Sequence, residues 1–327
     1  MKRTKRIGIV FNPAKNMKSF NKALEAFKNE GFELDIVGSE SFDDFMVRTQ
    51  QLTQNSNMDM LVIGGGDGSV LAGINGMASF EIPVGILPLG CSNDFAHSLG
   101  IHHMDDAIHT ITEGKTKKVD LGEAGFTDSN GIDKKMYFSS TAGIGFISSI
   151  LEIENKPFIA LSKKLIKDTI WPILAFYRAL FLRYGRVIIS VNDIAVFSGK
   201  ITLLEVSKVK KVGGVLLTPD AELDNGYLDF WMVERMNLFK FLYSILAKVF
   251  SSRYRELEHI TYFSSGQTGS PGNAKVKRLH IEAEERMPFH LNGEYLGDYS
   301  EVSFDICNTH RLNMLYHEVN AKVRLHP

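Results

Sequence analysis

Glycine, aspartate and hydroxyl residues follow a short apolar run in the segment 59–76. Met60–Ile63 has the length of a buried strand, and the apolar residues from Val70 to Met77 are spaced as on one helix face. The loop between them, Gly64–Ser69, allows the backbone to approach a ligand closely, and amide groups at a helix start attract anions. Asp67 would repel a bare phosphate, so it indicates a Mg²⁺ between carboxylate and phosphates, directly or through water. The structural alternative is a tight turn that Asp67 caps.

A second polar loop, Gly90–Ala96, follows the apolar run Val84–Leu87. Ser, Asn and Asp are common helix caps, and capping alone is the structural alternative. The functional interpretation places Asp94 near the metal and the backbone of Gly90–Asn93 near a nucleotide. The chain has no P-loop pattern ending in Gly-Lys-Ser/Thr, which excludes an ordinary P-loop kinase. It also has no HExxH or CxxC motif.

Alternating strands and helices are predicted for the first third of the chain. The strands are Arg6–Phe11, Phe32–Val37, Met60–Ile63 and Val84–Leu87, and helices are expected around 20–27 and 42–54. This order predicts an α/β domain, a mostly parallel sheet with helices on both faces. Ligands of such sheets bind beyond the carboxyl ends of the strands, where Asn12–Pro13, Gly64–Gly68 and Pro88–Asp94 fall.

From about Gly122 the pattern changes to short strands bounded by Gly, Asn, Asp or Pro, with few helices between them. This favours a second, mainly antiparallel, sandwich-like domain. We expect residues 1–122 and 300–327 to form a nucleotide-binding domain and residues 123–299 a lipid-substrate domain. The final strand, Ser303–Cys307, is expected to return to the first domain.

The amino-acid composition restricts the type of protein that this chain can be. The 327 residues are 44% hydrophobic and 23% charged with a net charge of −1, which fits a globular protein and gives no global field to attract nucleic acid. Two cysteines fit a reducing compartment, and the basic N-terminus lacks the apolar region of a signal peptide. We therefore expect a cytoplasmic protein without a nucleic-acid partner.

A basic and aromatic segment lies at 156–186. It holds seven basic residues (Lys156, Lys163, Lys164, Lys167, Arg178, Arg183, Arg186) and one acidic residue (Asp168). Aromatic residues are interleaved with them, among them Trp171, Phe176, Tyr177 and Phe181. A segment of this kind can lie on an anionic membrane surface, here the inner face of the membrane. The alternative is a domain-packing helix with a solvated charged side.

Two motifs together, Gly65–Ser69 and Gly90–Ala96, resemble the diacylglycerol kinase catalytic-domain family, which includes soluble bacterial lipid kinases and is related to NAD kinases. Weaker motifs continue the likeness in order along nearly the whole chain: Lys118–Gly122, Gly143–Phe146, Pro219–Tyr227 and Leu291–Tyr295. The resemblance implies a Rossmann-like domain with a β-sandwich domain. It also implies ATP and Mg²⁺ as cofactors and a lipid hydroxyl, that of diacylglycerol, as the acceptor.

The resemblance also implies roles for single residues. Asp67, Asp94 and Asp120 would gather Mg²⁺ through water, and Glu294 would be the general base on the lipid hydroxyl. The nucleotide would contact Asn12, Gly64, Gly65, Gly66, Asp67, Gly68, Ser69, Gly90, Cys91 and Asn93. A structural metal would be held by Glu222, Asn225 and Tyr227, partly through backbone carbonyls, with Asn225 replacing an acid.

Some positions depart from the family pattern and keep alternatives open. Cys91 stands where the family usually has Thr, Lys15-Asn16 where it has Ser-Gly, and Asn292 where it has Asp. An NAD kinase-like enzyme and a non-catalytic lipid- or nucleotide-binding regulator are the two alternatives to a lipid kinase. Formation of a homodimer is also left open.

Overall fold

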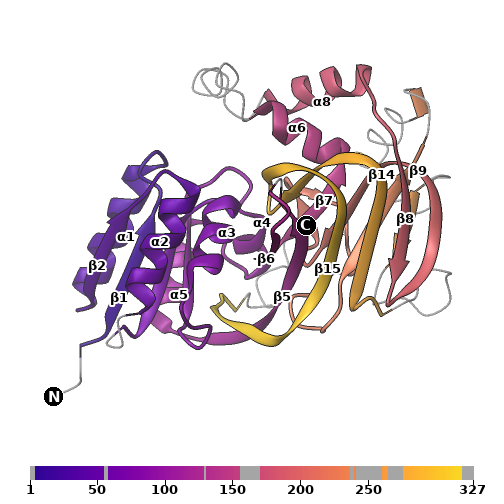
Figure 1. The fold of residues 1–327 in the computed structure, drawn as a ribbon. Helices are drawn as coiled ribbons and strands as arrows, with labels where there is room; N and C mark the ends of the chain where they lie inside the picture. The colour runs from indigo at the N-terminus through magenta and orange to yellow at the C-terminus, as the bar shows by residue number, and fades with distance from the viewer. Residues whose placement is uncertain are drawn as a thin grey trace, which may run out of the picture. The chain divides into compact units, whose positions relative to one another are not determined.

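A computed structural model describes residues 4–54, 58–128, 130–154, 170–235, 239–240, 260–263 and 275–318. The chain divides into two compact units, which Figure 1 traces in chain order. Unit 1 is Met1–Asp120 with Thr309–Pro327, and unit 2 is Leu121–Asn308. The predicted assignment of nucleotide and lipid binding to two domains, with boundaries near 122 and 300, stays a prediction, because compactness does not report which ligand a unit binds.

Unit 1 alternates strands and helices as predicted. Its elements are β1 (Arg6–Phe11), α1 (Met17–Asn29), β2 (Glu33–Gly38), α2 (Phe42–Thr53), β3 (Met60–Gly65), α3 (Asp67–Gly76), β4 (Val84–Pro88), α4 (Asp94–Ser98), α5 (Met104–Glu113), the start of β5 (Thr116–Thr127) and the end of β15 (Glu294–Leu315).

The sheet of unit 1 is parallel, in the order β4-β3-β1-β2. Val62 of β3 lies beside Ile9 of β1 and Gly85 of β4. The end of β15 adds a parallel pairing of Met314 with Val84. Because β1, β3 and β4 run the same way as neighbours, the loops that follow them emerge at one edge of the sheet, as the sequence predicts.

Local sequence explains the helices around this sheet. Phe20, Ala23 and Phe27 of α1 are three to four residues apart and buried, which is the spacing of one helix face. The Asn16 side chain caps α1 by accepting from the Ser19 N–H, and Ser41 caps α2 in the same way. All six residues of β3 are buried, so the strand that leads into the glycine loop lies in the core.

Unit 2 is mainly antiparallel. Its elements are the rest of β5, β6 (Asp133–Phe138), β7 (Thr141–Gly145), α6 (Phe146–Glu154), α8 (Ile170–Leu180), β8 (Gly185–Val191), β9 (Ile194–Ser207), β10 (Lys211–Val212), β11 (Val215–Leu216), β12 (Asp229–Glu234), β13 (Ile260–Phe263), β14 (Arg278–Leu291) and most of β15. Strands follow the order β13-β12-β9-β7-β14-β15, and β8 pairs with both β14 and β9. The antiparallel pairing is confirmed, and the sandwich arrangement stays a prediction.

The last strand differs from its prediction. Residues Ser303–Cys307 are part of β15 and pair with β14 inside unit 2. Only the stretch Thr309–Leu315 of the same strand belongs to unit 1. The sequence pattern identified one apolar part of β15 and missed its length, because the polar residues on either side, such as Glu301 and Asn308, also accept an extended conformation.

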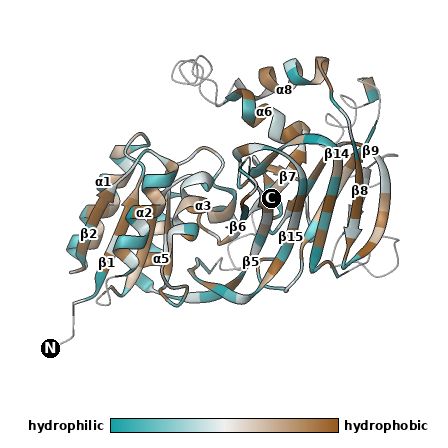
Figure 2. Cartoon of the chain, viewed as in Figure 1, coloured by the Kyte–Doolittle hydropathy of each residue, from teal (hydrophilic) through white to brown (hydrophobic). Residues whose placement is uncertain are grey.

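Helix α8 lies within the predicted basic and aromatic segment, of which residues 155–169 fall outside the described part. Leu174 and Ala179 of α8 are buried in a core shared with Phe146 and Ile150 of α6, and Figure 2 shows hydrophobic residues along much of α8. Arg178 does not project to solvent as a membrane-facing residue would. Its Nε donates to the Ser149 carbonyl at 2.9 Å and its guanidinium is paired with Glu152.

Candidate functional site

Three loops meet at the carboxyl edge of the unit 1 sheet. The backbone N–H of Asn12 donates to the Gly64 carbonyl at 2.9 Å, which joins the loop after β1 to the loop after β3. The N–H groups of Leu89 and Gly90 both donate to the Gly65 carbonyl, at 2.9 and 3.2 Å, which joins the loop after β4 to the same glycine run. The predicted gathering of these loops is therefore confirmed.

Glycine is required in these loops because the backbones pack against each other. A Cβ atom on Gly90 would lie 2.5 Å from the Gly66 Cα. A Cβ on Gly65 would lie 2.2 Å from the Ser69 Oγ, at the first turn of α3. Steric crowding, rather than positive φ, therefore fixes glycine at both positions. The start of α3 is left as a turn of backbone amides without a side-chain cap, which is the kind of site that accepts phosphate.

Asn93 builds the second loop. It is buried and has a φ of 49°, in the left-handed region that Asn tolerates. Its Oδ1 accepts from the Gly90 N–H at 2.9 Å and its Nδ2 donates to the Gly90 carbonyl at 2.8 Å. The side chain thus closes the loop on itself, a role that the sequence did not predict. Cys91, inside the same loop, is exposed.

Asp67 faces the start of α4. Its Oδ2 accepts from the Asp94 N–H at 3.2 Å and its Oδ1 from the Phe95 N–H at 3.1 Å. Burial and the nearby charge of Asp94 raise the pKa of Asp67 to about 6. The two carboxylates are therefore close enough to repel each other, and a divalent cation with bound phosphates would relieve that repulsion. Asp67 does not cap its own helix α3, which has no side-chain cap. It accepts instead from the first backbone N–H groups of α4, a contact that the sequence did not predict.

Asp120 is placed differently from the other two acids. It is buried, and its Oδ1 lies 2.9 Å from the Arg311 Nε, in the part of β15 that belongs to unit 1. Within the described part of the chain, no group of three or more His, Cys, Asp or Glu side chains is arranged to hold a metal ion. The predicted use of Asp120 for Mg²⁺ stays a prediction. Arg311 was missed, because nothing in the sequence links it to a residue so far away in the chain.

Glu294 lies in unit 2, directly after the turn between β14 and β15, and is half-buried. The turn is Asn292-Gly293, with φ values of 45° and 81°, as in a tight hairpin. The buried Asn292 side chain accepts through Oδ1 from the N–H groups of Ser139, Ser140 and Thr141 at 3.3, 3.0 and 3.4 Å. Its Nδ2 donates to the Ser139 Oγ at 3.0 Å. Asn292 therefore fixes the turn that carries Glu294.

The predicted structural-metal residues lie in a turn of unit 2. Glu222 is exposed, while Asn225 and Tyr227 are half-buried. The Asn225 Oδ1 and the Tyr227 carbonyl both accept a hydrogen bond from the Lys208 Nζ, at 3.1 and 2.6 Å. The sequence analysis predicted no role for Lys208, because a lysine at the end of a strand is usually exposed to solvent.

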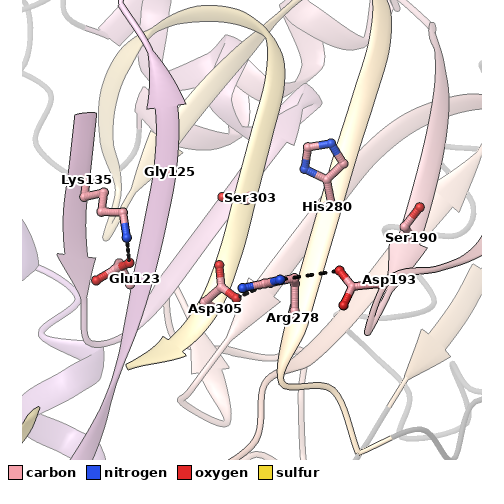
Figure 3. Close-up of a pocket in the computed structure, with 9 residues that line it drawn as sticks. All are labelled: Glu123, Gly125, Lys135, Ser190, Asp193, Arg278, His280, Ser303 and Asp305. Atoms are coloured by element: carbon pink, nitrogen blue, oxygen red, sulfur yellow. Dashed lines mark hydrogen bonds and ion pairs between the residues drawn. The ribbon is translucent and has the colours of Figure 1, made fainter. Parts of the chain in front are cut away.

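A polar cavity of about 540 Å³ also lies in unit 2, on strands β5, β14 and β15. Figure 3 shows that its cations point to its own anions. Lys135 is 2.8 Å from Glu123, and Arg278 is 2.7 Å from Asp305. Arg278 also pairs with Asp193 at 3.5 Å, so both cations are occupied by the carboxylates of the cavity itself. Since no predicted site residue lines the cavity either, the unit 1 loops remain the candidate site.

Residues 6–124 match the model of the diacylglycerol kinase catalytic domain. Over 303 residues the chain is 26% identical to the diacylglycerol kinase of Bacillus subtilis, covering 90% of this chain and 91% of the relative. It is 28% identical over 308 residues to that of Staphylococcus epidermidis, covering 90% and 87%. The motifs that suggested this family thus lie in a region that the family model also matches.

Solved structures show the same fold. A putative diacylglycerol kinase from Bacillus anthracis superposes with a TM-score of 0.73 at 22% identity, covering 97% of this chain and 99% of the other. An NAD kinase from Archaeoglobus fulgidus in complex with ATP superposes with a TM-score of 0.52 at 11% identity, covering 96% and 94%. None of the described helices has the length and hydrophobicity needed to span a bilayer.

Proposed function

We propose that the chain transfers the γ-phosphoryl group of ATP to the hydroxyl of diacylglycerol, which yields phosphatidic acid, because residues 6–124 match the model of the diacylglycerol kinase catalytic domain. The observation that carries the proposal is the contact between the two glycine loops, with the Asp67 carboxylate directed at the start of the second. Gly66 and Gly90 pack without side chains, and the amides at the start of α3 are uncapped. This arrangement suits a nucleotide polyphosphate.

In the proposed reaction each group has one task. Backbone amides of Gly66–Ser69 hold the phosphates of ATP. Asp67 and Asp94 would hold Mg²⁺, directly or through water, and the ion would supply positive charge to the phosphates. Asp120 orients Arg311 at 2.9 Å within unit 1. Glu294 takes the proton of the lipid hydroxyl, which makes that oxygen a better nucleophile.

An NAD kinase-like activity is the second candidate, because an ATP-bound NAD kinase shares the fold at a TM-score of 0.52. The higher TM-score of 0.73 for a putative diacylglycerol kinase favours a lipid acceptor. The curated relatives that cover about nine-tenths of the chain are diacylglycerol kinases as well, at 26% and 28% identity. The lipid is therefore our proposal, and NAD serves as the competing acceptor in its test.

The test incubates the purified chain with labelled ATP, Mg²⁺ and one acceptor at a time: diacylglycerol, a sphingoid base, phosphatidylglycerol, a polyprenol or NAD. Labelled phosphatidic acid is the expected product. Label in another lipid would keep the kinase and change the substrate, and NADP would favour the second candidate. Normal ATP binding with no labelled product from any acceptor would favour a non-catalytic regulator.

We also propose that α8 contacts the surface of an anionic membrane, where the lipid substrate resides. Five side chains spaced as on one helix face are each more than half exposed: Ile173, Phe176, Tyr177, Leu180 and Phe181. Arg183 follows the helix and is exposed, whereas Arg186 lies in β8 and pairs with Glu284 at 3.4 Å. An exposed apolar stripe beside a cation suits a bilayer that carries anionic headgroups.

Vesicle sedimentation tests this contact. The chain is expected to sediment with vesicles that contain phosphatidylglycerol and to stay in the supernatant with phosphatidylcholine alone. Phe176→Ser with Phe181→Ser should abolish the binding, whereas Ile194→Ser, at an equally exposed apolar residue on another face of unit 2, should leave it intact. Equal binding by all three forms would contradict the assignment of α8.

A further inference from the structure

Lys208 is a fully buried cation at the end of β9. The residue has no exposed surface. Its Nζ donates to the Tyr227 carbonyl at 2.6 Å and to the Asn225 Oδ1 at 3.1 Å. A buried ammonium group is very costly unless oxygen atoms replace its water shell. The turn that contains Asn225 and Tyr227 supplies those oxygens, so the turn and the lysine stabilise each other.

The same turn is where the family resemblance implies a structural metal, with Glu222, Asn225 and Tyr227 as ligands. Carbonyl and side-chain amide oxygens are ligands that Mg²⁺ and Ca²⁺ accept. Here, however, the Asn225 and Tyr227 oxygens point to an ammonium group, and Glu222 is exposed. A divalent cation on the same oxygens would lie beside a positive charge, and the neutral Asn225 amide does not compensate for it. The residues of this turn do not fit a metal.

We propose that the ammonium group of Lys208 takes the place of the structural cation at this turn. A lysine ammonium is a compact point charge with three donors, so it can serve two or three converging oxygens as an ion would. The replacement of an acid by Asn225 agrees with the change of cation, because a single positive charge needs less negative charge around it than a divalent ion. The turn is then held by a covalently attached cation at any metal concentration.

Lys208 also connects the turn to the hairpin that carries Glu294. Its backbone N–H donates to the Ser140 carbonyl at 2.8 Å, and the Ser140 N–H donates to the Asn292 Oδ1 at 3.0 Å. A continuous series of hydrogen bonds therefore runs from Tyr227 through Lys208 and Ser140 to Asn292. Loss of the cation should loosen this series as well as the turn.

Thermal unfolding without nucleotide tests the proposal and does not depend on kinase activity. The wild-type chain should unfold at the same temperature in EDTA and in Mg²⁺, and metal analysis of the purified chain should find less than one bound ion per chain at this turn. Asp67→Asn, measured in parallel, separates any effect of Mg²⁺ at the unit 1 loops. An Mg²⁺-dependent rise that persists in Asp67→Asn and disappears in Asn225→Ala would overturn the proposal.

Two variants test how much the Lys208 ammonium group contributes to the unfolding temperature. Lys208→Met removes the donor to the Tyr227 carbonyl and one of the donors to the Asn225 Oδ1, which keeps the hydrogen bond from the Tyr227 N–H at 3.0 Å. The variant should lower the unfolding temperature by roughly 5 °C or more. Lys275→Met is the matched control: its amine lies 5.2 Å from the centre of the Tyr227 ring, but the residue is exposed. It should change the unfolding temperature little. Equal unfolding temperatures for Lys208→Met and the wild type would overturn the proposal.

A double variant restores the conditions for a metal. Lys208→Met with Asn225→Asp removes the ammonium group and supplies an acid, so its unfolding temperature should rise when Mg²⁺ replaces EDTA. If the double variant folds and shows no such rise, the turn is not a cation site and the proposal fails. If it does not fold, the comparison of the wild type in EDTA and Mg²⁺ still decides.

Discussion

The Asp67 carboxylate accepts a hydrogen bond from the backbone N–H of Phe95 at 3.1 Å. Together with the bond from the Asp94 N–H, it makes Asp67 the cap of α4 as well as a candidate metal ligand. The first loop therefore holds the second in place. A substitution at Asp67 changes both the charge at the proposed nucleotide site and the position of the loop beside it.

Asp67→Ala is expected to abolish phosphoryl transfer and to remove the cap of α4, which usually costs about 0.5–2 kcal/mol of unfolding free energy. At neutral pH part of that loss is offset, because the variant also removes the buried charge that Asp94 repels. Asp106→Ala is the matched control, because Asp106 also accepts from two backbone N–H groups, those of His102 and His103. It should lose similar stability in urea unfolding and keep full activity. Activity retained by Asp67→Ala would contradict the site.

The raised pKa of Asp67 predicts a pH dependence. The carboxylate becomes protonated as the pH falls below about 6, so binding of Mg²⁺-ATP should weaken there. Because the folded-state pKa lies above the ordinary value near 3.9, the folded chain holds this proton more tightly. This group therefore makes the free energy of unfolding decrease as the pH rises from about 4 to about 6.

Asp94→Asn separates the causes of that shift. It removes the charge that raises the pKa of Asp67 but leaves the effect of burial, so the midpoint should move part of the way toward the ordinary value. A carboxyl-carbon NMR titration of Asp67 measures the midpoint directly in both forms. An unchanged midpoint would mean that the two carboxylates do not interact, and a higher one would reverse the assigned sign.

Glu294→Gln tests the proposed base. The change keeps size and most hydrogen bonding but removes the proton acceptor, so kcat should fall by about 10²–10⁴-fold with the KM for ATP nearly unchanged. Glu284→Gln, on the exposed part of β14, should leave kcat intact. A loss seen mainly as a higher KM for the lipid would make Glu294 a residue that positions substrate.

Asn292 is expected to stabilise the fold through its hydrogen bonds and its left-handed backbone conformation. Asn292→Ala removes the acceptor of three backbone N–H groups and places Ala at a φ of 45°, which should cost about 2–4 kcal/mol of unfolding free energy. Asn292→Asp keeps the acceptor and should cost much less in urea unfolding above pH 5. Asn192→Ala, at an exposed hairpin turn with a similar φ of 49°, provides the comparison and should cost less than Asn292→Ala.

Cys91 offers a chemical probe of the nucleotide loop. It is exposed while Cys307 is buried, so iodoacetamide should modify Cys91 first, and bound Mg²⁺-ATP should slow the reaction. Cys307 serves as the internal control in the same mass spectrum. Cys91→Thr should bind ATP equally well or more tightly, because it supplies a hydroxyl at the same exposed position. Modification of Cys91 at an equal rate with and without ATP would place the nucleotide elsewhere.

Much of unit 1 could be predicted from sequence because its signals are local. The run Met60–Ile63 and the glycines after it specify strand, loop and helix start within a few residues, and the structure places them as β3 and α3. Hydrophobic spacing and capping residues identified α1 and α2 for the same reason. The meeting of the loops then follows from the parallel order of the strands.

The contacts that define individual roles could not be predicted, because they depend on residues far apart in the chain. Arg311 reaches Asp120, Asn292 reaches Ser139–Thr141, and Lys208 reaches Tyr227. The inward direction of Arg178 is similar, since α6 supplies Glu152 and the Ser149 carbonyl. A sequence pattern assigns charged residues to solvent by default, and only the tertiary partners reverse that assignment.

The strand β15 has a consequence for how the chain is made. Its end supplies Met314, which pairs with Val84 of β4, so the sheet of unit 1 stays unfinished until residues 309–315 have left the ribosome. Through all that synthesis β4 is an open strand edge, a recognised starting point for aggregation. A chain halted after Asn308 would complete unit 2 but leave this edge exposed, and premature termination there should yield an insoluble product.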